Sequence, residues 1–129
     1  MSEREVKYYK MLAKKYETAE KMFEAKEDYD ELEADKASFQ KKQARGNAEV
    51  QEQQLKIVKL RNDGKEDKAL KQEMKLKKKE ANIAQFKRTI QEIQSKIEKK
   101  KLEVLKNEGE LQKIETQLRA DFAEKFTQM

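Results

Sequence analysis

The sequence predicts an all-α protein, a long antiparallel coiled-coil helical hairpin. The chain of 129 residues has no Pro and only three Gly, so few residues oppose a continuous helix. Charged residues make up 44% and apolar residues 36%, whereas soluble domains average about 25% charged residues. The apolar residues nevertheless recur at three- and four-residue spacing, which is the pattern of amphipathic helices that pack through a narrow seam.

One break divides the chain almost at its midpoint. Asn62, Asp63 and Gly64 all tolerate turn geometry, and Gly accepts a positive φ without strain. We therefore expect a single helical domain over residues 1–129, with a first helix over about 2–61, a turn at 62–64 and a second helix over about 65–127. Each arm would be on the order of 90 Å long at a rise of 1.5 Å per residue.

The first helix has the less regular seam. Its N-terminal part is expected to bury Tyr9, Leu12, Tyr16, Ala19 and Phe23, after which the register slips. The seam then continues through Met22, Ala25, Tyr29, Leu32, Phe39, Val50, Ile57 and Leu60. Polar seam positions, which cost stability but can fix the register, are expected at Lys36, Gln43, Gly46 and Gln53.

The second helix has a clearer seam, sustained over about six heptads. Its members are Leu76, Ile83, Phe86, Ile90, Ile93, Ile97, Val104, Leu111, Ile114 and Leu118, with Lys79, Lys100 and Asn107 as polar interruptions. Folding the chain at the turn brings the two patterns into line, so that Phe39 faces Phe86 and Tyr29 faces Ile97.

Two weaker breaks leave a second architecture open. Gly46 with Asn47, and Gly109, could each end a helix, which would give a compact three- or four-helix bundle. Because Gly inside a helix costs only about 1 kcal/mol, neither break is obligatory.

Charge is the main functional clue. Residues 17–35 contain nine acids and two lysines, and this acidic segment would lie opposite Lys96, Lys99, Lys100, Lys101 and Lys106. Residues 36–48 and 71–88 face each other and form a basic band of net charge +9 without an acidic counterpart. Its candidate partner-binding residues are Lys36, Lys41, Lys42, Arg45, Lys71, Lys75, Lys77, Lys78, Lys79, Lys87 and Arg88. Such a band favours an anionic partner.

The composition excludes many functions. Without His or Cys there is no Ser–His or Cys–His arrangement, no usual transition-metal site and no disulfide framework. We expect no enzyme activity, no catalytic residue, no metal ligand and no cofactor. The N-terminal residues carry no apolar run of a signal peptide, and no stretch approaches a membrane span. An intracellular, cytoplasmic location is expected.

These observations predict a non-catalytic protein–protein interaction module: a scaffold, an adaptor or a stalk subunit of a larger assembly, with an acidic or helical protein partner. Docking would use incompletely covered apolar residues, namely Tyr8, Met11, Leu55, Val58 and Leu105. A homodimer is also open, because two hairpins can pack as a four-helix bundle. A nucleic-acid-associated helical protein is the alternative, although no known nucleic-acid motif or stacking surface accompanies the basic band.

A further alternative comes from the residues around the turn. Lys56-Ile57-Val58-Lys59-Leu60-Arg61, then Asp63-Gly64, Lys71-Gln72 and Leu76, resemble tubulin-binding cofactor A. Ile83, Arg88, Ile90 and Ile97, and the string Val104-Leu105-Lys106-Asn107-Glu108, extend this similarity over about residues 33–122. The chain departs from that family at Glu66-Asp67-Lys68, where the family has a Tyr-Asp pair, and in having no Pro. The resemblance implies a helical-bundle chaperone that binds β-tubulin.

Overall fold

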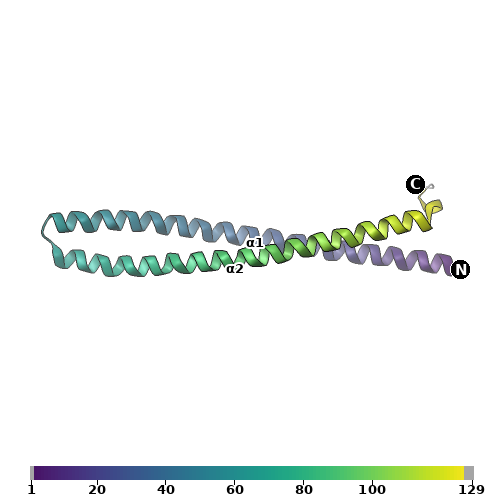
Figure 1. Ribbon diagram of the computed structural model, residues 1–129, viewed down its shortest axis with the longest axis horizontal. Coiled ribbons are helices and arrows are strands. Elements are labelled where there is room, and N and C mark those ends of the chain that lie inside the picture. The colour runs from purple at the N-terminus through teal and green to yellow at the C-terminus, as the bar shows by residue number, and fades with distance from the viewer. Residues whose placement is uncertain (1, 127–129) are drawn as a thin grey trace. The chain divides into compact units, whose positions relative to one another are not determined.

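Two long helices make up most of the computed structural model, which describes residues 2–126. Helix α1 spans Glu3–Asn62, helix α2 spans Glu66–Asp121, and a short 3₁₀ helix, η1, spans Ala123–Lys125 (Figure 1). Those residues contain no strand. The two long helices pack against each other in opposite directions, so the prediction of an all-α helical hairpin is confirmed.

The chain divides into two compact units, and each unit contains segments of both long helices. Among the described residues, unit 1 comprises 2–31 and 97–126, and unit 2 comprises 32–96 with the turn. In each unit a segment of α1 therefore packs against a segment of α2.

The turn in unit 2 ends α1 in the way that its glycine predicts. Gly64 has φ 75°, and no other described residue has a positive φ. The Lys65 amide donates to the Leu60 carbonyl (2.8 Å), and the Gly64 amide donates to the Arg61 carbonyl (3.0 Å). This pair of hydrogen bonds is the Schellman motif, in which a left-handed residue satisfies the last carbonyls of a helix. The turn occupies residues 63–65, one residue later than expected.

The seam of unit 2 follows the predicted heptad positions. Val50, Gln53 and Ile57 of α1 are buried, as are Ala69 and Ile93 of α2. The rings of Phe39 and Phe86 face each other with centroids 6.3 Å apart, which confirms that predicted pair. Of the polar seam residues, Gln53 donates from Nε2 to the Gln72 carbonyl (3.1 Å) and to Gln72 Oε1 (2.9 Å). Lys36 donates to Gln94 Oε1 (2.6 Å).

The seam of unit 1 differs from the prediction for the start of α1. The register does not slip: counting back from Ala25 in alternating steps of three and four residues leads through Met22 and Thr18 to Lys15, Met11 and Tyr8, all buried or half-buried. Tyr9, Tyr16 and Phe23, predicted as seam residues, are 58%, 62% and 58% exposed. Two neighbouring stripes of α1 could contact α2 here. The stripe that does so is the one that continues the heptad register of the following residues.

The glycines inside the helices do not break them. α1 runs through Gly46 and α2 runs through Gly109, which rules out the compact three- or four-helix bundle. Gly46 faces the seam, where a Cβ atom would lie 2.8 Å from Cγ1 of Ile83. The missing side chain therefore makes room for Ile83, which explains a glycine in the middle of this helix.

The ends of both helices meet in a small core in unit 1. Ile114, Leu118 and Phe122 form this core, and Tyr8, Met11, Leu12 and Phe126 pack against it. Phe122 is 2% exposed, and its ring lies edge-on to that of Tyr8, with centroids 5.2 Å apart. Tyr8 and Met11 pack against this core but are only half-buried, and Leu55, Val58 and Leu105 are exposed as expected.

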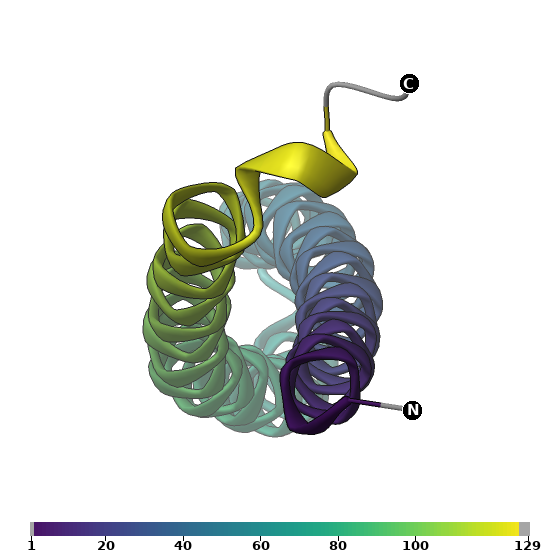
Figure 2. The same ribbon diagram turned by 90° about the vertical axis from the view of Figure 1, so that its right-hand side faces the viewer.

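Arg4 of α1 contacts the C-terminal end of α2. Its Nη2 donates to the Asp121 carbonyl (2.9 Å) and pairs with Glu124 (2.6 Å), and its guanidinium lies 5.4 Å from the Phe122 ring centroid. α2 therefore ends at Asp121 and not near residue 127, because Phe122 leaves the helix to cover Tyr8. Figure 2 looks onto this end and shows η1 turning away from the axis of α2.

Charge pairing in unit 1 is sparser than the sequence suggested. Of the acidic residues between 17 and 31, only Asp28 lies within an ion-pair distance of the facing lysines, at 3.3 Å from Lys100. Hydrogen bonds from Lys100 to Glu103 and to Asp28 raise the pKa of this lysine above its ordinary value. Lys26 pairs with Glu108 at 3.6 Å. In this ion pair α1 supplies the lysine and α2 the glutamate, the reverse of the expected arrangement.

Candidate functional site

A groove lined mainly by basic residues follows one side of the seam in unit 2. It consists of three adjoining hollows of about 600, 330 and 260 Å³. Lys56, Gln72 and Lys75 line both the first and the second hollow, and Glu49 and Lys79 line both the second and the third. The hollows are therefore continuous, and we call them together the basic groove.

The first hollow lies next to the turn and carries no acid. Its lining residues come from both helices: Lys56, Leu60, Lys68, Lys71, Gln72, Met74, Lys75 and Lys78. Five of these eight residues are lysines, and Leu60 and Met74 supply apolar surface. Lysine side chains add their methylene stems to such a surface while keeping the ammonium groups in water.

Heptad position explains why these lysines gather on one side. Lys56 directly precedes the seam residue Ile57, and Lys68 and Lys75 directly precede the seam residues Ala69 and Leu76. At 3.6 residues per turn, a residue just before the seam borders it on one side, and residues three later lie next to it on that side. Lys71 and Lys78 occupy those adjacent positions.

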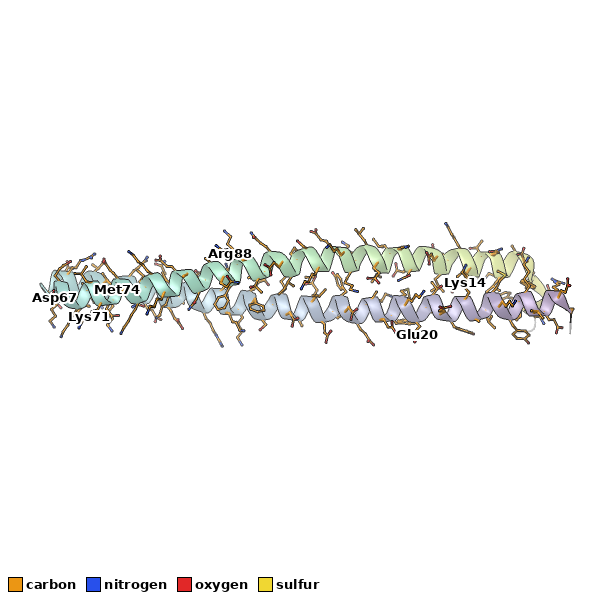
Figure 3. The ribbon with its side chains drawn as sticks, turned by 90° about the horizontal axis from the view of Figure 1, so that it is seen from below. Lys14, Glu20, Asp67, Lys71, Met74 and Arg88 are labelled. Carbon is orange, nitrogen blue, oxygen red and sulfur yellow. The ribbon has the colours of Figure 1, made fainter. Side chains whose placement is uncertain are left out.

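The lysines of the first hollow are available to a partner. Within residues 2–126, none of the five lies within 4 Å of a carboxylate in an ion pair. Met74 is 68% exposed, which is high for a large apolar side chain. Figure 3 labels Met74 and Lys71 on α2 close to the turn. The hollow thus combines unpaired positive charge with accessible apolar surface.

Acids enter the groove farther from the turn. Glu49 and Glu52 line the second hollow, and Glu49 lies 3.9 Å from Lys79. The basic band was expected to have no acidic counterpart, but Glu49 follows directly after the acid-free segment 36–48 and faces that band. Lys42 and Arg45 line the third hollow, where Lys42 also lies 4.7 Å from the Phe39 ring centroid.

The structure separates the predicted binding residues into three groups. Those that line the basic groove are Lys42, Arg45, Lys71, Lys75, Lys78 and Lys79. Lys36 is half-buried in the seam, where it binds Gln94. The remaining residues, Lys41, Lys77, Lys87 and Arg88, are exposed outside the lining of the groove.

Two lysines of the groove, and exposed Met74 of its first hollow, are not among the predicted binding residues. Lys56 and Lys68 fall outside the segments chosen for their lack of acids, and Met74 falls between seam positions. The signal that finds the lysines is their place beside the seam, not the local charge. A charge count over a window cannot detect it, because adjacent residues of a helix face different directions.

The turn end of unit 2 holds a separate charged cluster. Arg61 binds Glu73 and also Glu66, whose Oε1 lies 3.4 Å from Arg61 Nε. The hydrogen bond to Glu73 is the main cause that raises the pKa of Arg61 above its ordinary value. Because Arg61 already has carboxylate partners, it is not a candidate for binding a further anion.

Residues 2–126 contain no group of three or more acidic side chains placed to hold a metal ion. Over the same residues, neither α1 nor α2 combines the length and apolar character that crossing a lipid bilayer requires.

Comparison of the chain with protein-family models, curated proteins and solved structures found no match. The similarity to tubulin-binding cofactor A therefore stays an expectation drawn from the residues around the turn.

Proposed function

We propose that this chain is a non-catalytic helical interaction protein, a scaffold, adaptor or stalk subunit, whose basic groove binds an acidic helical segment of a partner protein. The observation that carries the proposal is the first hollow, with five lysines, no acid and exposed Met74. The chain contains no cysteine, which is typical of proteins from reducing compartments, and the proposal therefore includes an intracellular, cytoplasmic location.

A helix is the partner that suits the shape of the groove. The groove runs between two antiparallel helices, and its walls are residues at heptad positions beside the seam. A third helix placed along such a groove packs its side chains between those of the first two, as in helical bundles. Its inner stripe would contact Leu60 and Met74, and acidic residues on its flanks would meet the lysines.

Nucleic acid is a weaker candidate for the same surface. Single-stranded nucleic acids bind through exposed aromatic side chains on which bases stack. The phenylalanines of unit 2, Phe39 and Phe86, face each other across the seam. The exposed apolar residue of the first hollow is Met74, which suits the side chains of a protein partner better than the faces of bases.

The proposal is tested with a synthetic helical peptide of three heptads that has Leu in the inner stripe and Glu on the flanks. We expect fluorescence anisotropy to show binding of this peptide to the full chain, and no binding of the same peptide with Lys on its flanks. The variant Lys71→Glu/Lys75→Glu/Lys78→Glu should weaken binding at least about tenfold, because opposite-sign contacts become like-sign contacts.

A matched control variant has the same net charge as this triple variant. Lys41→Glu/Lys77→Glu/Lys87→Glu also replaces three exposed lysines, none of which lines the basic groove. At about 0.15 M salt the screening length is about 8 Å, so charges outside the groove should matter little. Equal losses in both variants, with helicity intact by circular dichroism, would contradict a local site. Tighter binding of a single-stranded oligonucleotide than of the acidic peptide would favour the nucleic-acid alternative.

A further inference from the structure

The surface of unit 1 carries an apolar stripe that α2 covers only in part. Tyr9, Tyr16 and Phe23 follow one another at seven-residue spacing on α1 and are each more than half exposed. Half-buried Leu12 and Ala19 lie between them, at the three- and four-residue spacing of a helix-packing seam. We call these five residues the aromatic stripe.

The partners of the stripe within the chain leave most of its area open. Lys15 lies 6.0 Å from the Tyr16 ring centroid, Lys26 lies 5.8 Å from that of Phe23, and Tyr8 lies edge-on to Tyr9. Exposed aromatic rings in a row at helical spacing are a common feature of interaction surfaces, because Tyr and Phe bury large areas when a partner covers them.

One rim of the aromatic stripe is acidic, whereas Lys15 and Lys26, which pair with Glu115 and Glu108 of α2, border the other. Glu17, Glu20, Glu24 and Glu27 are exposed on the same segment of α1, and within the described residues none of them forms an ion pair. Figure 3 labels Glu20 on this segment. Unit 1 thus presents an apolar helical stripe with one acidic flank, and apolar surface and negative charge are the two properties that the basic groove of unit 2 requires in a partner.

The two surfaces also agree in length. The aromatic stripe, from residue 9 to residue 23, extends about 21 Å at 1.5 Å per residue. The groove is lined from Lys42 to Leu60 on α1 and from Lys68 to Phe86 on α2, which corresponds to about 27 Å. One chain therefore carries both a helical stripe and a groove that can contain it.

We infer that the chain associates with itself, with the aromatic stripe of one copy seated in the basic groove of a second copy. The inference rests on the proposed function, because it names a second copy of this chain as an acidic helical partner of the groove. Charge complementarity between the rim and the walls of the groove would set the orientation, and the three aromatic side chains would anchor the contact.

Light scattering coupled to size exclusion, on the full chain over a wide concentration range, tests the inference. We expect an assembly of two or more 15.3 kDa chains. Tyr9→Ser/Tyr16→Ser/Phe23→Ser should weaken self-association by about a hundredfold or more, as expected on removing several anchoring aromatic residues. The control Leu55→Ser/Val58→Ser/Leu102→Ser also removes three exposed apolar side chains, and it should keep the mass of the assembly.

A charge exchange shows which surfaces meet. Lys71→Glu/Lys75→Glu/Lys78→Glu and Glu17→Lys/Glu20→Lys/Glu24→Lys should each be monomeric alone, and mixing them should restore association. A wild-type chain that is monomeric throughout, or a mixture that stays monomeric, would overturn the inference. Binding of the acidic peptide to the groove would still support the proposed function after that result. If neither self-association nor peptide binding were observed, both proposals would be overturned.

Discussion

The two glycines inside the long helices occupy different surroundings, and alanine at each position should report this. A Cβ atom at Gly109 would meet no atom within 4 Å, whereas at Gly46 it would lie 2.8 Å from Cγ1 of Ile83. Alanine is about 1 kcal/mol better than glycine within a helix. We expect Gly109→Ala to raise the free energy of unfolding by about this amount.

Gly46→Ala should stabilise less than Gly109→Ala, or should destabilise, because Ile83 would have to move. Urea unfolding followed by circular dichroism measures both free energies. Equal stabilisation by the two substitutions would show that Ile83 does not pack into the space that Gly46 leaves.

At the scale of elements, the end of α2 depends on one aromatic side chain. Phe122 is 2% exposed, contacts Tyr8 and Arg4, and belongs to the core that joins both helices in unit 1. Phe122→Ala should lower the free energy of unfolding by about 3 kcal/mol, as typical of losing a buried phenylalanine.

The same substitution should speed amide hydrogen exchange near Leu118 and leave exchange near Ile57, in unit 2, unchanged. Phe126→Ala is the control, because Phe126 only packs against this core and is half-buried. A loss no larger than that of the control would contradict the role assigned to Phe122.

The elements differ in how far sequence could predict them. The seam of α2 was predictable because its branched and aromatic residues leave one continuous stripe. The turn was predictable because Gly64 accepts a positive φ without strain and follows two residues, Asn62 and Asp63, that also tolerate turn geometry. The start of α1 was not, because Tyr9, Tyr16 and Phe23 form the more hydrophobic stripe while Lys15 and Thr18 occupy the real seam. Continuity of the register outweighed local hydrophobicity.

The positive charge of the candidate site was predictable, but the residues that line it were not. A basic surface followed from the acid-free segments, yet Lys77 and Lys78, adjacent in sequence, differ in that only Lys78 lines the groove. Glu49 and Lys56 of α1 line the groove together with residues of α2 because the two helices pack against each other. That pairing depends on the register between helices, which a linear charge count does not contain.

At the scale of the whole molecule, the net charge of +5 hides an uneven distribution. Unit 2 contains 17 Lys and Arg against 10 Asp and Glu, whereas unit 1 contains 14 against 16. Basic and acidic surfaces thus lie on different units, and each is accompanied by exposed apolar side chains. This division suits a protein that acts by binding helices.

Methionine methyl NMR during titration with the acidic helical peptide tests the central claim most directly. Met74 lines the basic groove and is 68% exposed, whereas Met22 is buried in the seam of unit 1 at 8% exposure. We predict that the Met74 methyl resonance shifts and saturates with the peptide while the Met22 resonance stays in place. A Met74 resonance that does not move when the peptide is fully bound would contradict binding in the groove.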